Sequence, residues 1–108
     1  MEIEDILKNT DKLFFSIREV SEITELSSSV LRFWEKEFSE LHPQKSRGGH
    51  RRYQKSDIEL IIKIKKLLYE DKFTIKGAKE ELKKRARKNY LDFEAAKKEL
   101  RNILEILK

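Results

Sequence analysis

The stretch SSSVLRFWEKEFSELHPQKSRGGHRRY, residues 27–53, decides the fold of this chain. Its first part predicts a helix, because Ser27 is a preferred N-cap residue. The inward face of this helix would carry Val30, Leu31, Trp34 and Phe38. Pro43 ends the helical region, and two short basic segments follow. Gly48-Gly49 joins these segments and predicts a two-residue β-hairpin turn.

A second helix is predicted just upstream, at about residues 17–24. Ser16 and Glu19 have the spacing of a capping box, in which each side chain accepts a hydrogen bond from the other residue's backbone N–H. About three residues separate this helix from the Ser27 cap. Two short helices joined by so short a turn are typical of a helix-turn-helix. The inward residues of the upstream helix would be Ile17, Val20 and Ile23.

The outward face of the second helix and the hairpin both favour contact with DNA. The helix turns outward Ser28, Ser29, Arg32, Phe33 and Lys36. An outward aromatic ring beside an arginine and small hydroxyl residues suits a groove better than a plain solvated face. Residues 42–55 contain five basic residues and no acidic one. This hairpin could simply be kept soluble by charge, but solvated hairpins usually mix both signs, so phosphate contact is favoured.

Composition limits the class of protein. The chain has 108 residues, of which 42% are charged, with 3 Gly, 1 Pro and no Cys. This predicts one small, mainly helical domain without disulfides or thiolate metal sites. The net charge is +5 and the basic excess lies in the middle of the chain, as expected for a polyanion partner, although Lys-rich helices are often only solvated. Lacking a long apolar run or a signal peptide, the chain is expected to be cytoplasmic, without a membrane partner.

The sequence favours a non-enzymatic protein. It contains no nucleophile–base set, no metal-ligand cluster and no phosphate-cradling Gly loop, so we expect no cofactor. His42 and His50 flank the hairpin and are interpreted as surface or turn residues, not as metal ligands.

Two further helices are predicted after the hairpin. Ser56 and Glu59 have capping-box spacing and would open a helix to about Asp71, the main core element. Thr74 would cap the next helix, which points Ile75, Ala78 and Leu82 inward. The basic run at residues 83–88 is interpreted as a solvated helix end and linker, with contact to backbone phosphates as the less favoured alternative.

The C-terminal segment predicts a dimerisation helix. Asp92 would be its N-cap, and apolar residues then recur at alternating spacings of three and four, which is the seam of a coiled coil. The seam consists of Phe93, Ala96, Leu100, Ile103 and Leu107, widened by Leu104. Because two heptads form only a marginal coiled coil, the helix could instead fold back on its own domain. Pairing of two copies is favoured.

The order of these motifs resembles the MerR family of bacterial transcription regulators. The similar segments are FSIREVSEIT, SSSVLRFWEKEF, RGGHRRYQKSDIELIIKIKKLL and FTIKGAKEEL. The resemblance implies a mainly α fold: a winged helix-turn-helix with a two-stranded wing, two supporting helices and a C-terminal dimerisation helix that pairs antiparallel. It divides the chain into a lead-in at residues 1–13, a DNA-binding domain at residues 14–88 and the dimerisation helix at residues 89–108.

The resemblance also implies roles for individual residues. The helix at residues 28–38 would lie in the major groove, where Ser29, Arg32 and Phe33 reach the DNA. Arg51 and Tyr53 match the wing's Arg-x-Tyr, which contacts phosphates, and Arg18 lies at a helix N-terminus that suits an anion. Together with the neighbouring polar side chains, the predicted DNA-contacting set is Ser16, Arg18, Ser28, Ser29, Arg32, Phe33, Lys36, Lys45, Arg47, His50, Arg51, Arg52 and Tyr53.

The sequence departs from the family pattern in three ways. Glu25 and Lys72 stand where the family often has glycine, so the turn at Glu25 could be strained or differently shaped. Family activators also carry an effector region after the dimerisation helix, and the metal sensors among them use Cys there. This sequence ends at Lys108 and has no Cys. The chain is therefore expected to be either a minimal member or a fragment that lacks the sensing part.

The expected function is that of a transcription regulator on the nucleoid. It would bind double-stranded DNA at an inverted repeat as a homodimer, and RNA polymerase would be an indirect partner through promoter DNA. The alternative is an architectural, recombination or chromosome-anchoring DNA-binding protein with low sequence specificity. A protein-interaction adaptor would leave the basic wing unexplained.

Overall fold

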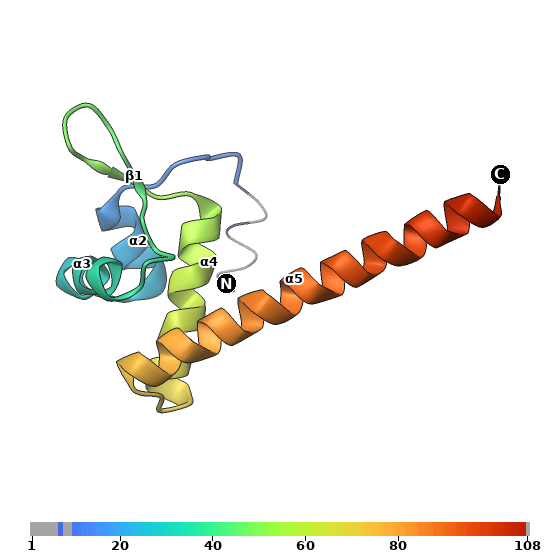
Figure 1. Ribbon diagram of the computed structural model, residues 1–108. Helices are drawn as coiled ribbons and strands as arrows, with labels where there is room; N and C mark the ends of the chain where they lie inside the picture. Colours follow the sequence, from blue (N-terminus) through green and yellow to red (C-terminus); the bar gives the residue numbers. More distant parts are fainter. Residues whose placement is uncertain (1–6, 8–9, 108) are drawn as a thin grey trace. The chain divides into compact units, whose positions relative to one another are not determined.

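A computed structural model describes residue 7 and residues 10–107 of the chain (Figure 1). Most of the predicted lead-in at residues 1–13 lies outside this part, although Leu7 is buried and the Thr10 carbonyl accepts a 2.8 Å hydrogen bond from Lys55 Nζ. The chain forms two compact units, Met1–Lys72 and Phe73–Lys108. We describe each unit by itself.

The first unit begins with the two predicted short helices, α2 (Ile17–Thr24) and α3 (Ser28–Glu37). The predicted capping box is confirmed: Ser16 Oγ accepts from the Glu19 N–H at 3.2 Å, and the Glu19 carboxylate accepts from the Ser16 N–H at 3.1 Å. Ser27 caps α3 by accepting from the Val30 N–H at 3.2 Å. These caps fix the starts of both helices and confirm the helix-turn-helix.

Helix α4 (Lys55–Lys65) begins earlier than predicted. The Asp57 carboxylate accepts from the Gln54 N–H at 2.8 Å, so the predicted cap at Ser56 is wrong by two residues. Ile58, Ile61 and Ile64 are buried along α4. The helix then continues as a π-helical turn, η1 (Lys66–Glu70), where the Asp71 N–H donates to the Lys66 carbonyl at 3.0 Å.

The core of the first unit lies among α2, α3 and α4, since α2 contacts both other helices. Thr24 is buried at the end of α2, where its hydroxyl donates to the Val20 carbonyl at 2.7 Å. Lys65 Nζ donates to the Thr24 carbonyl at 2.8 Å, which joins α4 to the end of α2. The most deeply buried apolar side chains of this unit are Val20, Leu31, Trp34, Phe38, Leu41, Tyr53, Ile58, Ile61, Ile64 and Leu67.

Two short antiparallel strands form the wing, β1 (Gln44–Lys45) and β2 (Arg51–Arg52), with Lys45 opposite Arg51. The predicted two-residue turn is wrong. The Ser46 N–H donates to the His50 carbonyl at 2.8 Å, and the Gly49 N–H donates to the Ser46 carbonyl at 2.9 Å, so the loop contains three residues. Only Gly49 needs a positive φ, of 79°, as the last residue of such a loop usually does.

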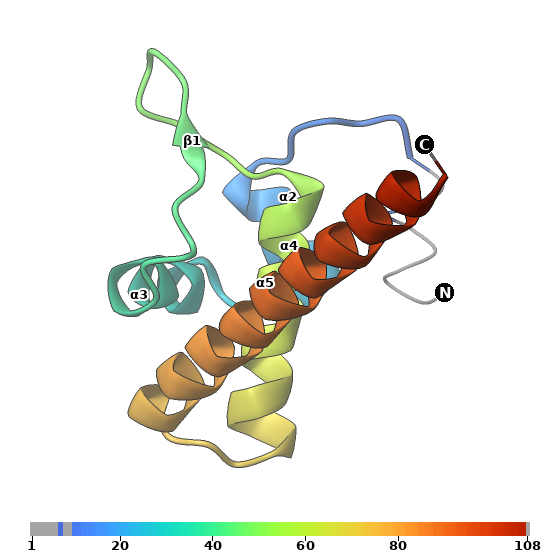
Figure 2. The same cartoon turned by 45° about the vertical axis from the view of Figure 1, so that its right-hand side comes forward.

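The wing is tied to the helices at its base. Phe15, in the segment before α2, forms a bridge with Tyr53, and each backbone N–H donates to the other residue's carbonyl at 2.8 Å. In two views the wing and α3 lie on the same side of α4 (Figures 1 and 2). The wing and the second helix of the helix-turn-helix therefore share one face of this unit.

The second unit is a single helix, α5 (Ile75–Ile106), which Thr74 caps by accepting from the Gly77 N–H at 3.0 Å. The predicted linker at residues 83–88 and the predicted cap at Asp92 are wrong, because the helix runs through both. No glycine or proline lies between Ala78 and Ile106, so nothing in the backbone ends it. The expected boundary between residues 88 and 89 thus falls inside α5, and that division of roles stays a prediction.

Candidate nucleic-acid interface

Helix α3 has a buried face and an exposed face, as its sequence predicts. Leu31 is fully buried, and Trp34 packs beneath the helix with its ring 6.1 Å from that of Tyr69. Phe33 is 49% exposed, although it is a large aromatic residue in the middle of a helix. The exposed residues beside it are Ser29, Arg32 and Lys36, and Ser28 is partly exposed. Such a surface, aromatic and cationic with a small hydroxyl group, can contact base edges and phosphates.

The wing presents positive charge next to α3. Its exposed residues from the predicted set are Lys45, Arg47, His50 and Arg52. The Arg52 guanidinium lies 4.0 Å from the centre of the Phe14 ring, a cation–π contact that restricts the side chain. The wing and the exposed face of α3 could therefore meet the same strip of a polyanion.

Arg51 differs from the other wing cations because it is paired within the chain. Its Nε donates to Glu35 on α3, at 2.8 Å from Oε2 and 3.1 Å from Oε1. The two side chains are only 25% and 13% exposed. The predicted phosphate contact of Arg51 stays a prediction, and the structure adds a bond between the wing and α3.

Tyr53 does not lie on this surface. The sequence placed it among the DNA-contacting residues, but the structure buries it completely, and its hydroxyl has no hydrogen-bond partner among the described residues. Burial, and next the negative charge of Glu35, raise the pKa of Tyr53 above its usual range. We therefore assign Tyr53 to the core beneath the wing, because a fully buried side chain cannot touch DNA without moving.

The N-terminus of α2 brings Ser16 and Arg18 to the surface, where both are exposed. Arg18 Nε lies 3.6 Å from Glu22 Oε1, and Lys12 pairs with Glu19. Hydrogen bonds from Lys12 and from the Ser16 backbone hold the pKa of Glu19 below its usual value. An anion at this helix end would meet the Glu19 carboxylate, so the Arg18 contact predicted from the sequence rests on the arginine itself.

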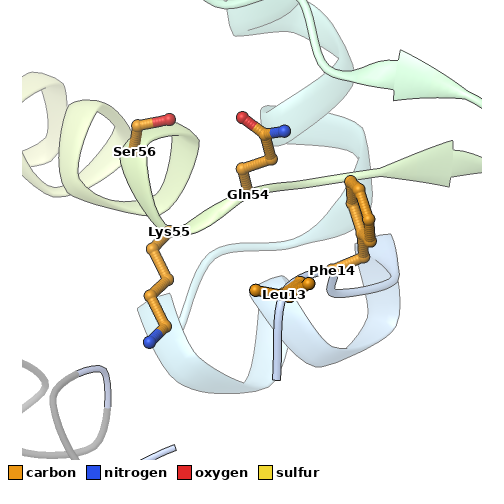
Figure 3. Close-up of a pocket in the computed structure, with 5 residues that line it drawn as sticks. All are labelled: Leu13, Phe14, Gln54, Lys55 and Ser56. Carbon is orange, nitrogen blue, oxygen red and sulfur yellow. The ribbon is translucent and has the colours of Figure 1, made fainter. Parts of the chain in front are cut away.

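A shallow pocket of about 340 Å³ lies between the segment before α2 and the start of α4. Its lining residues are Leu13, Phe14, Gln54, Lys55 and Ser56 (Figure 3). Lys55 Nζ is already bonded to the Thr10 carbonyl, and the Phe14 ring supports Arg52. The pocket offers no pair of titratable groups for catalysis. We assign Phe14 a supporting role for the wing, which the sequence gave no signal to predict.

The described residues contain neither a metal cluster nor a membrane-spanning helix. No group of three or more His, Cys, Asp and Glu side chains in that part of the chain could hold a metal ion. Nor is any helix there long and apolar enough to cross a membrane.

Comparison with known families identifies the fold. The family described as "MerR HTH family regulatory protein" has a sequence profile that matches residues 15–85, more than half of the chain. The match extends from the bridge residue Phe15 through α2, α3, the wing and α4 into α5. This chain belongs to the MerR family. The resemblance seen in the sequence motifs is thereby confirmed.

Curated relatives support the same assignment. The chain is 35% identical over 52 residues to the HTH-type transcriptional regulator MlrA of Escherichia coli strain K12. It matches the MlrA proteins of Salmonella typhimurium strains SL1344 and LT2 with the same identity. The match spans 48% of this chain but only 21% of the relatives. The matched segment thus covers about a fifth of the length of these regulators.

Two of the described non-glycine residues adopt the left-handed conformation in this MerR fold. Glu25 follows α2 with a φ of 59°, and Lys72 follows η1 with a φ of 58°. These are the two positions where glycine is common in the MerR pattern. The predicted strain at Glu25 is therefore present in the backbone, since a side chain disfavours this conformation.

The predicted dimerisation residues lie on α5 and are exposed. Phe93 is 61% exposed, Leu100 58% and Leu107 75%. Ile103 and Leu104 are more than half exposed, and Ala96 is exposed as well. An apolar stripe of this kind on one helix needs a partner surface in water.

Proposed function

We propose that this MerR-family chain is a sequence-specific DNA-binding transcription regulator. The observation that carries the proposal is that α3 and the wing lie on the same side of α4, with Arg32 and Phe33 exposed on α3 and cations exposed on the wing. In this proposal α3 enters the major groove, and the wing contacts phosphates beside it. Family membership also supports the expectation that the chain is not an enzyme.

The regulator is proposed to act as a homodimer on an inverted repeat. The exposed apolar residues of α5 would pair with those of a second copy, since they repeat over two heptads. In each copy, α3 and the wing together form the face that would read DNA, here called the reading face. A dimer with two-fold symmetry presents two identical reading faces, and these match an inverted repeat. The chain would regulate transcription in the cytoplasm, on nucleoid DNA. It would affect RNA polymerase indirectly, through the promoter DNA.

The test is selection of DNA fragments from a random pool by the purified chain at about physiological salt. Enrichment of an inverted repeat is the expected result, and the enriched sequence is the operator. Retention without enrichment, which collapses as salt rises, would instead support an architectural protein of low specificity. Fragments retained as a single half-site would contradict the homodimer and leave the reading face intact.

A further inference from the structure

Glu35 lies on α3, but its carboxylate faces the wing. Only 13% of its side chain is exposed, and both carboxylate oxygens lie within 3.1 Å of Arg51 Nε. The exposed pair Arg18–Glu22 offers a comparison within the same chain, with a 3.6 Å separation and side chains that are 89% and 69% exposed. Shielding from water strengthens a charge pair, and it raises the cost of removing one partner.

The Glu35–Arg51 pair lies close to a buried tyrosine. Tyr53 lies two residues beyond Arg51 and is fully buried beneath the wing. Glu35 and Arg51 shift the pKa of the Tyr53 hydroxyl in opposite directions, so all three groups lie within electrostatic reach. The base of the wing is held by the Phe15–Tyr53 bridge. The Glu35–Arg51 pair adds a second attachment, this time to the helix that carries Arg32 and Phe33.

We propose that Glu35 is a positioning residue that sets the specificity of DNA recognition. By holding Arg51 against α3, it fixes the wing relative to the exposed face of the helix, so both elements meet DNA in one register. The inference rests on the proposed DNA-binding function. A carboxylate repels phosphates, so Glu35 lowers the non-specific affinity for DNA. Its contribution to specificity comes from fixing the position of the wing.

The test compares affinity for the selected operator with affinity for random DNA, at one salt concentration. In Glu35→Gln the ratio of the two affinities should fall about fivefold or more, because operator binding weakens while random binding does not. In an Arg51→Ala background the same substitution should change the ratio by no more than about twofold, since its partner is already absent.

Arg47→Ala is the matched control. Arg47 lies in the exposed wing loop, outside the ion pair. Its loss should weaken operator and random DNA equally, and the effect of Glu35→Gln should be the same with or without Arg47. Arg51→Lys is a second variant that keeps the charge but lacks the guanidinium Nε that donates to both Glu35 oxygens, and it too should lower the ratio.

Each other outcome has a definite meaning. A lower melting temperature with an unchanged affinity ratio in both Glu35→Gln and Arg51→Lys would reduce the pair to a structural role and overturn the inference. An equal loss of ratio in the wild-type and Arg51→Ala backgrounds would also overturn it, because Glu35 would then act without Arg51. Wild-type protein that selects no operator would instead refute the proposed function.

Discussion

At the scale of single residues, three described positions depart from the usual preferences for burial or backbone conformation. Tyr53 buries a hydroxyl without a partner among the described residues, and Glu25 and Lys72 adopt a conformation that glycine prefers. Each feature has an energetic cost that the surrounding fold must offset. Two stability predictions follow from these costs.

Replacing Tyr53 by Phe removes only the buried hydroxyl. Because that hydroxyl loses its hydration without gaining a bond, Tyr53→Phe should leave the free energy of unfolding unchanged or raise it by about 1 kcal/mol. Urea denaturation measures the change. A loss of about 1 kcal/mol or more would show that the hydroxyl has a partner in solution, such as the nearby Glu35 carboxylate or an ordered water.

Replacing Glu25 by Gly relieves backbone strain at the end of α2, where a residue with a Cβ atom adopts the left-handed conformation. The relief of about 1–2 kcal/mol is partly offset by the greater freedom of glycine in the unfolded chain, so a net gain of about 0.5–1 kcal/mol is expected. Glu25→Ala is the control, because it keeps the Cβ atom and should show no such gain. Equal stability of the two variants would mean that φ at this position is not the source of strain.

At the scale of elements, local signals predicted the starts of α2, α3 and α5, but they misplaced the start of α4 and suggested a further helix start at Asp92. Ser16, Glu19 and Ser27 act through residues three positions away, so their caps were predictable. Either Gly48 or Gly49 could take a positive φ, so the sequence alone did not decide whether the wing loop has two or three residues. Asp92 has the side chain of a cap, but a helix already in progress passes through it.

The role of α3 can be tested through Arg32, an exposed residue on the helix. If Arg32 reads a base, Arg32→Ala should lower operator affinity by roughly 1–3 kcal/mol and relax specificity at one position. Binding titrations on the operator and on its single-base variants measure both effects. Equal weakening on every sequence would make Arg32 a phosphate contact, with a salt slope shallower by about one unit.

At the scale of the whole molecule, α5 carries a row of exposed apolar side chains, and such a row marks an interaction surface. Leu100→Asp should therefore abolish the proposed dimer, because it places a carboxylate in the proposed seam. Sedimentation at several protein concentrations gives the mass. Because Leu100 is exposed within a single chain, the Leu100→Asp variant should retain its helix content.

Asn102→Asp is the matched control for this variant. It makes the same change in charge on the same helix, but on the opposite face from Leu100. The control should remain dimeric. If wild type and both variants have the mass of a single chain, the seam does not pair two copies.

The sequence by itself determined the helix-turn-helix, the presence of a basic wing and the MerR family, because these depend on caps, periodicity and charge within short segments. The tertiary structure decided which of those residues are available. It buried Tyr53, paired Arg51 with Glu35 sixteen positions away, and placed Phe14 beneath Arg52. Burial and pairing depend on residues distant in sequence that the fold brings together, so no local pattern of residue types could reveal them.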